Sequence, residues 1–272
     1  MADSRAIGIF DSGLGGLTVV KEIIKKLPNE DIVYFGDTGR VPYGTRSHKV
    51  IRKYAAEDER FLLKNDVKII VAACGTVSSV AADDAERLPV PFFEMVTYAA
   101  KSAVKTTKNG IIGVIGTAAT IASESHKRKI IELMPTAQVV AASCSLFVPL
   151  VEEGWYSPDD IVVLETVKRY LKPIIDAGAD TLILGCTHYP ILERVIAKVT
   201  DGKVKLINPG ISVAEAVSEH LSESGAAAFG ERIGEHRFFV SDRAQSFRYT
   251  ASILLGEDID NEKITLVDLN SL

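Results

Sequence analysis

The sequence has few cysteines and no long hydrophobic run. Its three cysteines are an odd number without close spacing, which argues against a disulfide scaffold and against a cysteine-rich zinc site. Its longest mildly apolar stretch, residues 110–123, is too short and too rich in glycine and threonine to span a bilayer. Residues 1–5 carry no signal-peptide features. We therefore expect reduced thiols, a cytoplasmic location and no membrane partner.

An excess of basic residues is also missing. The sequence has 31 lysines and arginines against 36 aspartates and glutamates, a formal charge of −5, so it offers no general attraction to nucleic acid. The five histidines show no metal-ligand spacing, and neither a dinucleotide fingerprint, a Walker loop nor a pyridoxal lysine motif is evident. We expect no metal, no cofactor and no nucleic-acid partner.

What the sequence does contain is an alternation of short apolar runs with longer segments of helical periodicity. Strands separated by helices predict βαβ units and parallel sheets, in which active sites lie beyond the carboxyl ends of the strands. The expected strands are residues 6–10, 32–35, 69–73, 111–115, 139–142, 181–184, 205–207 and 238–240, and the expected helices are residues 17–27, 48–65, 119–133, 158–177 and 190–199.

The chain also contains a short internal repeat. Ile-Gly-Ile-Phe at residues 7–10 resembles Ile-Gly-Val-Ile at residues 112–115, an offset of 105, and the segments around Cys74 and Cys186 are offset by 112. We predict an α/β fold of two similar lobes, each a mostly parallel sheet flanked by helices, related by a pseudo-twofold axis with the active site between them. The tail from about residue 208 belongs to neither repeat. Its strand at 238–240 and helical segment at 244–255 are expected to return to the first lobe.

Cys74 and Cys186 are the most informative residues. Each follows an apolar, β-prone run, has a threonine within two positions and precedes a helix-like segment. The pKa of a thiol at a strand-to-helix junction is readily lowered, because the N–H groups at the helix start stabilise a thiolate. A lone cysteine in this setting is more often a buried small hydrophobe, but the pair favours acid/base chemistry on one atom from two sides, as in a racemase. Cys144 lacks this setting and is interpreted as a core residue.

Two loops at strand ends provide candidate ligand contacts. Residues 11–16, Asp-Ser-Gly-Leu-Gly-Gly, expose N–H groups at a helix start, which suits a carboxylate, although a structural βα turn explains them as well. Asp11 is placed to hold or accept the proton of a neighbouring thiol. The loop at residues 36–44 is either a plain connector or, through Tyr43 and the N–H of Gly44, a cap over a small ligand.

The second cysteine has a candidate helper. His188 follows Cys186 by two positions, and an imidazole exchanges protons with a thiol near neutral pH. Glu152 can orient that imidazole, although a solvated helix carboxylate explains Glu152 equally well. Thr76 and Thr187 add hydroxyls beside the two thiols.

These motifs resemble the glutamate racemase family, within the aspartate/glutamate racemase superfamily. The resemblance covers nearly the whole chain, and its last motif is the most diagnostic, because aspartate racemases carry Glu instead of His after Cys-Thr. The motifs in order are Asp11-Ser12-Gly13-x-Gly-Gly, Gly36-Asp37-x-x-Arg40-x-Pro42-Tyr43-Gly44, Cys74-x-Thr76, Leu146-Phe147-Val148-Pro149-Leu150-Val151-Glu152 and Gly185-Cys186-Thr187-His188-Tyr189-Pro190.

The resemblance implies a cofactor-independent racemase that interconverts L- and D-glutamate and supplies D-glutamate for peptidoglycan; we expect a homodimer. By matching position, Cys74 and Cys186 are the acid/base residues, Asp11 supports Cys74, and Glu152 and His188 support Cys186. Residues 1–98 with 208–272 would form one domain and residues 99–207 the other. The expected substrate-binding residues are Asp11, Ser12, Pro42, Tyr43, Gly44, Gly75, Thr76, Thr120 and Thr187.

The chain departs from the family pattern in three places. The residue after Cys74 is usually Asn and here is Gly75; Glu94 and Tyr98 stand where Gly and Pro are usual; and His126 replaces a common Tyr. Losing the Asn side chain predicts weaker glutamate binding with the reaction type unchanged. The competing explanation is that position 75 needs a backbone angle that only glycine tolerates.

Two other functions remain open on the sequence. A two-lobed α/β scaffold also suits a small-molecule binding protein without catalysis. A superfamily enzyme acting on another small acid, such as aspartate or a hydantoin, is the second alternative, although the His188 context disfavours aspartate.

Overall fold

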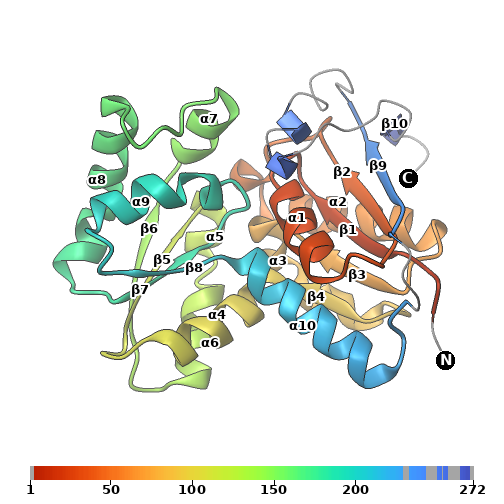
Figure 1. The fold of residues 1–272 in the computed structure, drawn as a ribbon, viewed down its shortest axis with the longest axis horizontal. Helices are drawn as coiled ribbons and strands as arrows, with labels where there is room; N and C mark the ends of the chain where they lie inside the picture. The colour runs from red at the N-terminus through yellow and green to blue at the C-terminus, as the bar shows by residue number, and fades with distance from the viewer. Residues whose placement is uncertain (1–2, 229–232, 243–249, 253, 257–263, 270–272) are drawn as a thin grey trace.

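The strands form two parallel sheets that lie side by side (Figure 1). The computed structural model describes residues 3–228, 233–242, 250–252, 254–256 and 264–269. The sheet of the first lobe has the order β10-β9-β2-β1-β3-β4 and that of the second lobe the order β6-β5-β7-β8. The strands are β1 (Ile7–Asp11), β2 (Ile32–Gly36), β3 (Ile69–Ala72), β4 (Phe92–Glu94), β5 (Ile111–Gly116), β6 (Gln138–Ser143), β7 (Thr181–Leu184), β8 (Lys205–Ile207), β9 (His236–Val240) and β10 (Ile264–Leu266).

The two sheets share one strand order. The series β2-β1-β3-β4 of the first lobe matches β6-β5-β7-β8 of the second, and every pairing between the described strands is parallel. Two similar α/β lobes are therefore present, and the predicted fold class is confirmed. The match pairs β3 with β7, the strands that precede Cys74 and Cys186, so the two thiols occupy corresponding places.

Helices cover both faces of the first sheet. Successive strand residues point to opposite faces, so Ile7 and Ile9 pack with helices α1 (Leu17–Lys26) and α10 (Pro209–Ser224), whereas Phe10 packs with α2 (His48–Lys64) and α3 (Gly75–Val80). The strands are apolar on both faces because both are covered.

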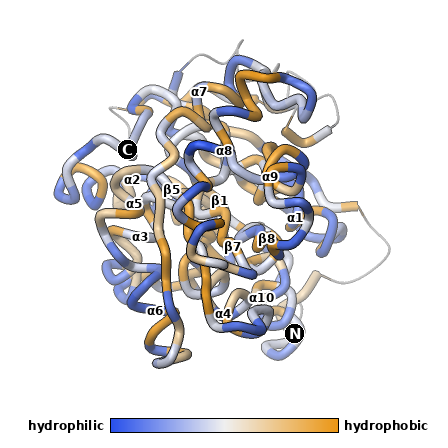
Figure 2. Tube along the Cα trace, turned by 90° about the vertical axis from the view of Figure 1, so that its left-hand side faces the viewer, coloured by the Kyte–Doolittle hydropathy of each residue, from blue (hydrophilic) through white to orange (hydrophobic). Residues whose placement is uncertain are grey.

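The second sheet is covered in the same way. Helices α4 (Met95–Thr106) and α6 (Ser125–Leu133) pack on one face, while α7 (Phe147–Glu152), α8 (Ile161–Asp176) and α9 (Glu193–Val199) pack on the other. The short helix α5 (Ala118–Ala122) follows β5. Figure 2 shows the hydrophobic stretches gathered in the strands, with hydrophilic stretches along loops and outer helix faces.

The expected strands are found to within two residues at each end, but three expected helices differ. The segment 119–133 is two helices, because Glu124 adopts a left-handed conformation (φ 53°) between α5 and α6. The helix expected from residue 158 begins at Ile161, where the Asp160 carboxylate accepts the N–H groups of Val162 and Val163. The segment from 190 begins as a short 3-10 turn before α9. Strands β4 and β10 and helices α3, α4, α7 and α10 were not among the expected ranges.

The tail returns to the first lobe. Strand β9 pairs with β2, and Ala251, Leu254 and Leu255 pack in the same core. Residues 250–252 and 254–255 are helical, and the rest of the expected helix 244–255 lies outside the described residues. The predicted boundary at 98/99 falls inside α4, whose Met95 packs in the first lobe and whose Ala99, Ala100 and Ala103 pack in the second. The division into domains stays a prediction.

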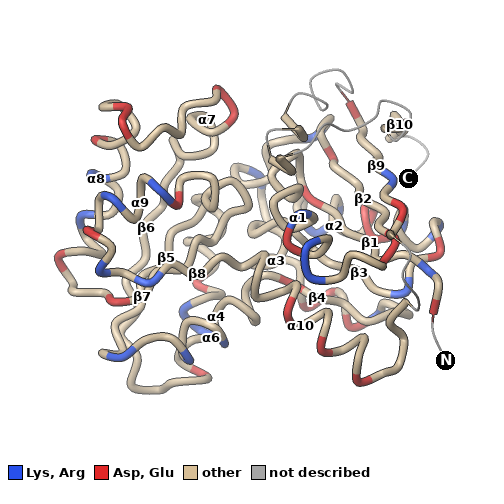
Figure 3. The backbone as a smooth tube through the Cα atoms, in the orientation of Figure 1, with Lys and Arg blue, Asp and Glu red and all other residues tan. Residues whose placement is uncertain are grey.

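In the part of the chain that the structure describes, no helix is long and apolar enough to cross a membrane. Figure 3 shows basic and acidic residues interspersed on both lobes.

Candidate active site

One cavity of about 320 Å³ opens where the carboxyl ends of both sheets meet. Each lobe contributes one cysteine to its wall, Cys74 after β3 and Cys186 after β7, so the structure brings the two predicted acid/base residues together. Of the other predicted site residues, Ser12, Pro42, Tyr43, Gly44, Gly75, Thr76, Glu152, Thr187 and His188 line the cavity, while Asp11 and Thr120 do not.

Cys74 is the residue immediately before helix α3, with an extended backbone, and its side chain is buried. Its thiol donates to Ser12 Oγ at 3.4 Å. Burial, followed by the nearby charge of Asp11, raises the pKa of the Cys74 thiol to about 12; hydrogen bonding of the thiolate form with Ser12 and with the Val77 N–H acts in the opposite direction. Cys74 is therefore a neutral thiol in the free protein at neutral pH.

Asp11 lies behind Cys74, at the end of β1. Its Oδ2 accepts the N–H of Gly16 at 2.8 Å, and its Oδ1 has no hydrogen-bond partner among the described residues. Burial raises the pKa of the Asp11 carboxyl, which Gly16, His188 and the Cys74 thiol act to lower. The position suits a residue that exchanges a proton with Cys74 without touching a ligand.

Cys186 has a different neighbour. Its Sγ lies 3.9 Å from His188 Nδ1, and His188 Nε2 lies 3.3 Å from Glu152 Oε1. Burial acts to lower the pKa of His188, but the Cys186 sulfur and the Glu152 carboxylate together raise it to about 10. His188 is therefore cationic at neutral pH, and Glu152 stands at its far side as the sequence predicted.

The loop after β2 lines the cavity through Pro42, Tyr43 and Gly44. The hydroxyl of Tyr43 points away from any ligand, because it donates to Asp37 Oδ2 and lies 3.0 Å from Asp58 Oδ2. Tyr43 can therefore meet a ligand only through its ring and backbone. A Cβ on Gly44 would lie 3.1 Å from Thr117 Cβ, so the loop also touches the second lobe.

A chain of threonine hydroxyls crosses between the lobes. Thr76 Oγ1 lies 3.2 Å from Thr117 Oγ1, which lies 3.0 Å from Thr120 Oγ1. Thr117 lines the cavity and Thr120 is buried behind it. Thr120 was predicted from the sequence, whereas Thr117 was missed. The internal repeat could have revealed Thr117. The offset of 105 between residues 7–10 and 112–115 places Thr117 at the position that corresponds to Ser12, a predicted site residue.

Other lining residues were also missed. The second lobe forms one wall of the cavity with residues around the start of α7, namely Ser145, Val148 and Pro149. Val148 and Pro149 belong to a motif that was recognised only as a family signature. The prediction that Cys144 is a core residue is confirmed, because its side chain is fully buried in the second-lobe core.

Gly75 lies at a point where the backbones of the two lobes meet. A Cβ built on Gly75 would overlap the carbonyl oxygen of Gly185, the residue before Cys186. Gly75 does not have a left-handed backbone, so the explanation by a glycine-only backbone angle is wrong. The missing side chain lets the two backbones meet, and an asparagine here would have to push the lobes apart.

The other two departures from the family pattern lie outside the cavity. Glu94 is buried and caps α4, accepting the N–H groups of Val96 at 2.5 Å and Thr97 at 2.8 Å, while Tyr98 stacks on Phe93. His126 is buried, neither ring nitrogen has a hydrogen-bond partner among the described residues, and burial lowers its pKa to about 4.

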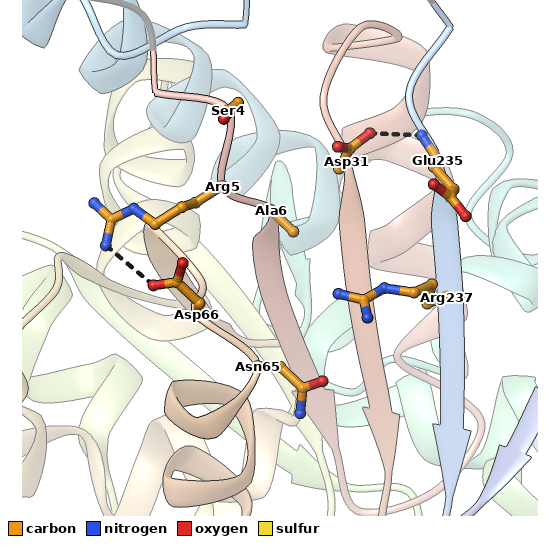
Figure 4. A pocket seen from close by; sticks show the side chains of 8 residues that line it. All are labelled: Ser4, Arg5, Ala6, Asp31, Asn65, Asp66, Glu235 and Arg237. Atoms are coloured by element: carbon orange, nitrogen blue, oxygen red, sulfur yellow. Dashed lines mark hydrogen bonds and ion pairs between the residues drawn. The ribbon is translucent and has the colours of Figure 1, made fainter.

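A second pocket, of about 310 Å³, lies at the opposite edge of the first sheet. Figure 4 shows it near the start of β1, β2 and β9, with Arg5 turned toward Asp66 and the Glu235 N–H bonded to Asp31. It contains no thiol and no histidine. The parallel strands run away from it, toward the cavity that holds the cysteines.

Comparison with known proteins identifies the family of the chain. A family model described as Asp/Glu/Hydantoin racemase matches residues 7–217, which places the chain in a class of isomerases. The chain is 44% identical to a glutamate racemase of Geobacter metallireducens over 93% of both proteins, and 45% identical to one of Sulfurihydrogenibium over 98% of this chain and 99% of the relative. The crystal structure of a Francisella tularensis glutamate racemase in complex with D-glutamate superposes with a TM-score of 0.91 at 38% identity, covering 99% of this chain and all of that one. The chain belongs to the glutamate racemase family.

Proposed function

We propose that the protein interconverts L- and D-glutamate without a cofactor, by a mechanism that uses two thiols. The observation that carries the proposal is that Cys74 and Cys186 come from opposite lobes and line one cavity. Two acid/base groups on opposite sides of one carbon can remove a proton from one face and deliver another to the opposite face. A binding protein has no need of that pair.

The Cα proton of an amino acid is a very weak acid, so the residues around it must lower the barrier through position and electrostatics. One thiolate removes the proton and the opposite thiol donates one. By resemblance to the family, Cys74 takes the proton of D-glutamate and Cys186 that of L-glutamate. The reactive state holds one thiolate and one thiol, which makes the two titrations coupled.

The helpers divide between the two thiols. In the free protein Cys74 carries its proton, and the cation of His188 lies 3.9 Å from the Cys186 sulfur, where it stabilises negative charge and can return a proton. The cation at this position suits the direction in which Cys186 acts as the base, which is proton removal from L-glutamate. In the opposite direction Asp11 is placed to take the proton of Cys74.

Small polar groups of the cavity would hold the glutamate carboxylates. Ser12, Thr76, Thr117 and Thr187 offer hydroxyls, and the N–H groups after Cys74 and Cys186 offer further donors. Thr120 supports Thr117 from behind. Gly75 contributes its backbone and its small size.

The family resemblance also supports three wider proposals. The product D-glutamate would serve peptidoglycan synthesis in the cytoplasm, and the protein would act as a homodimer. Light scattering coupled to gel filtration tests the homodimer, and a monomer mass would refute it. Limited proteolysis tests the domain division at residues 98/99 and 207/208.

Deuterium incorporation tests the function directly. Purified protein is incubated with single enantiomers of glutamate in D₂O, and optical rotation and Cα deuteration are followed. We expect each enantiomer of glutamate to convert to the other with deuterium at Cα. Exchange on aspartate alone would assign another superfamily activity, and no exchange on either acid would favour a binding protein.

Metal dependence is tested on the same protein. Exhaustive dialysis against EDTA should leave the activity unchanged, because the proposed chemistry needs only the two thiols. Loss of activity that added metal restores would contradict the proposal.

A further inference from the structure

Beneath the cavity loop lies a cluster of buried and partly buried polar groups that the mechanism does not use. It consists of Asp37, Arg40, Tyr43, Glu57 and Asp58, and only Tyr43 lines the cavity. We propose that Asp58 is a positioning residue that holds a proton and, through Tyr43, fixes the loop that meets the substrate. The proposal rests on the proposed function only where it concerns glutamate.

Arg40 ties the three carboxyl groups together. Its Nε donates to Asp37 Oδ2 at 2.5 Å, its Nη1 to Glu57, and its Nη2 to Asp58 Oδ1 at 3.0 Å. Its guanidinium also stacks on the ring of Tyr54, 4.2 Å from the centroid. One cation therefore faces three carboxyl groups, two of which, Asp37 and Asp58, are fully buried.

The hydroxyl of Tyr43 shows where a proton must lie. It has one hydrogen and stands between Asp37 Oδ2 and Asp58 Oδ2. If both carboxyls were ionised, one of these contacts would join two oxygens without a hydrogen between them. Three donors converge on Asp37, namely Arg40, Tyr43 and Ser241, so Asp37 is the ionised group. Asp58 then donates its own proton to the Tyr43 oxygen.

The electrostatics agree with this assignment. Burial raises the pKa of Asp58 well above its usual range, and the charges of Asp37 and Glu57 raise it further, against Arg40 and the Tyr43 hydroxyl, which lower it. Burial also raises the pKa of Tyr43, so its phenol stays neutral. With Asp58 neutral, Arg40 balances Asp37, and Glu57 remains as a partly exposed anion.

The consequence for the cavity follows from the position of Tyr43. The ring of Tyr43 and the backbone of Gly44 form part of the wall, and the network holds the hydroxyl end of that ring. Breaking the network would let the loop move, and substrate binding would weaken more than turnover.

Two matched amide substitutions test the assignment. In Asp58→Asn the side-chain oxygen can still accept from Arg40 and the amide can donate to Tyr43, which reproduces a protonated carboxyl. In Asp37→Asn the amide cannot accept the three donors. We expect Asp58→Asn to keep KM for glutamate within about threefold, and Asp37→Asn to raise it about tenfold, with a smaller change in kcat, as for the loss of one or two hydrogen bonds. Asp159→Asn, at an exposed carboxylate, is the control for the substitution itself.

An equal rise of KM in Asp58→Asn and Asp37→Asn, or a larger rise in Asp58→Asn, would overturn the proposal. A third variant, Asp58→Leu, should raise KM as Asp37→Asn does, since leucine offers neither bond. If Asp58→Leu behaves like wild type, the network does not position the loop.

A stability measurement decides the same question without catalysis. A carboxyl whose folded pKa is raised binds more protons in the folded state, so its contribution to stability falls as pH rises above the unfolded value. The amide of Asp58→Asn does not titrate, so its Tm relative to wild type should increase between pH 4 and pH 8. If Asp58 were an ionised partner of Arg40, its folded pKa would be lowered and that difference would stay nearly constant over this range, and the proposal would be refuted. This stability measurement tests the protonation of Asp58 even if the protein does not racemise glutamate.

Discussion

Cys74 and Cys186 follow corresponding strands of two lobes with the same strand order, yet their surroundings differ in charge. The neighbour of Cys74 is Asp11, a buried acid, whereas the neighbour of Cys186 is His188, a cation paired with Glu152. The repeated architecture determines where the two sulfurs lie. The single residues around each strand end determine which charged groups face each sulfur.

This difference has a chemical meaning. Two identical thiols in identical surroundings would both be protonated or would compete for one proton. A carboxyl group beside one sulfur and an imidazolium beside the other give the two thiols different partners for proton transfer, so that one can abstract while the other donates. The proposed reaction needs that separation in both directions.

The largest expected effect comes from removing either sulfur. Cys74→Ala and Cys186→Ala should each lower racemisation by about 10²–10⁴-fold, because neither thiol can serve the other face of the carbon. Steady-state assays in both directions measure the loss. Near-normal turnover in either variant would rule out two thiols. Cys144→Ala, which removes a buried thiol outside the cavity, is the matched control and should keep most of the activity.

The next effect tests how closely the lobes must meet. A side chain at position 75 would overlap the Gly185 carbonyl. Gly75→Ala and Gly75→Asn should therefore separate the two thiols and lower kcat about 10- to 100-fold, since a displacement of about 1 Å at a reacting centre costs up to that much. Ser79→Ala, on the same helix, removes a hydroxyl without a hydrogen-bond partner among the described residues and serves as control. A lower KM with unchanged kcat in Gly75→Asn would show instead that the lobes tolerate the side chain.

A smaller effect distinguishes the helpers. Asp11→Asn should impair the direction in which Cys74 is the base, and His188→Asn the direction in which Cys186 is the base, each about tenfold more than the opposite direction. The Haldane relation requires compensation in KM, so the asymmetry should appear in kcat. Identical losses of kcat in both directions, for both variants, would argue against separate helpers.

The smallest effect is on stability. The pKa of His188 in the folded protein is about 10, above the ordinary histidine value of 6.5. The protonation of His188 therefore stabilises the fold fully below about pH 6.5, and this stabilisation is lost as pH rises toward 10. The folded pKa of His126 is about 4, so its contribution has the opposite sign and is lost as pH falls from 6.5 to 4. A tenfold change in proton affinity corresponds to about 1.4 kcal/mol, so these shifts set upper bounds on the contribution to the free energy of unfolding of about 5 kcal/mol for His188 and about 3 kcal/mol for His126. Denaturant unfolding of His188→Gln and His126→Phe against wild type across this range measures both, and parallel pH profiles would contradict the opposite signs.

Much of the fold could be predicted from the sequence, because its buried strands are short apolar runs with clear ends. The short strand β4 was not predicted, and the helix expected over 119–133 is two helices because nothing in its periodicity signals the left-handed Glu124. The boundary at 98/99 falls inside α4 because one helix packs on both lobes, a property that a pattern along one segment cannot reveal.

The candidate site could be predicted where chemistry and sequence position coincide, as at Cys74, Cys186 and His188. It could not be predicted where contact between distant segments decides. The direction of the Tyr43 hydroxyl depends on Asp37 and Asp58, and the role of Gly75 depends on the carbonyl of Gly185 in the other lobe. Neither contact leaves a trace in local periodicity.

The place of β9 in the first sheet has a consequence for how the protein is made. The second sheet uses strands that follow one another without a break, from β5 to β8, whereas the first sheet is completed by β9, which leaves the ribosome after all of them. Chains fold as their segments emerge. The lobe that carries Cys186 can therefore fold during synthesis, whereas the sheet of the lobe that carries Cys74 is completed only after the last strands are made. A nascent chain stalled before residue 236 would hold both thiols but lack the finished sheet that sets the first of them in place.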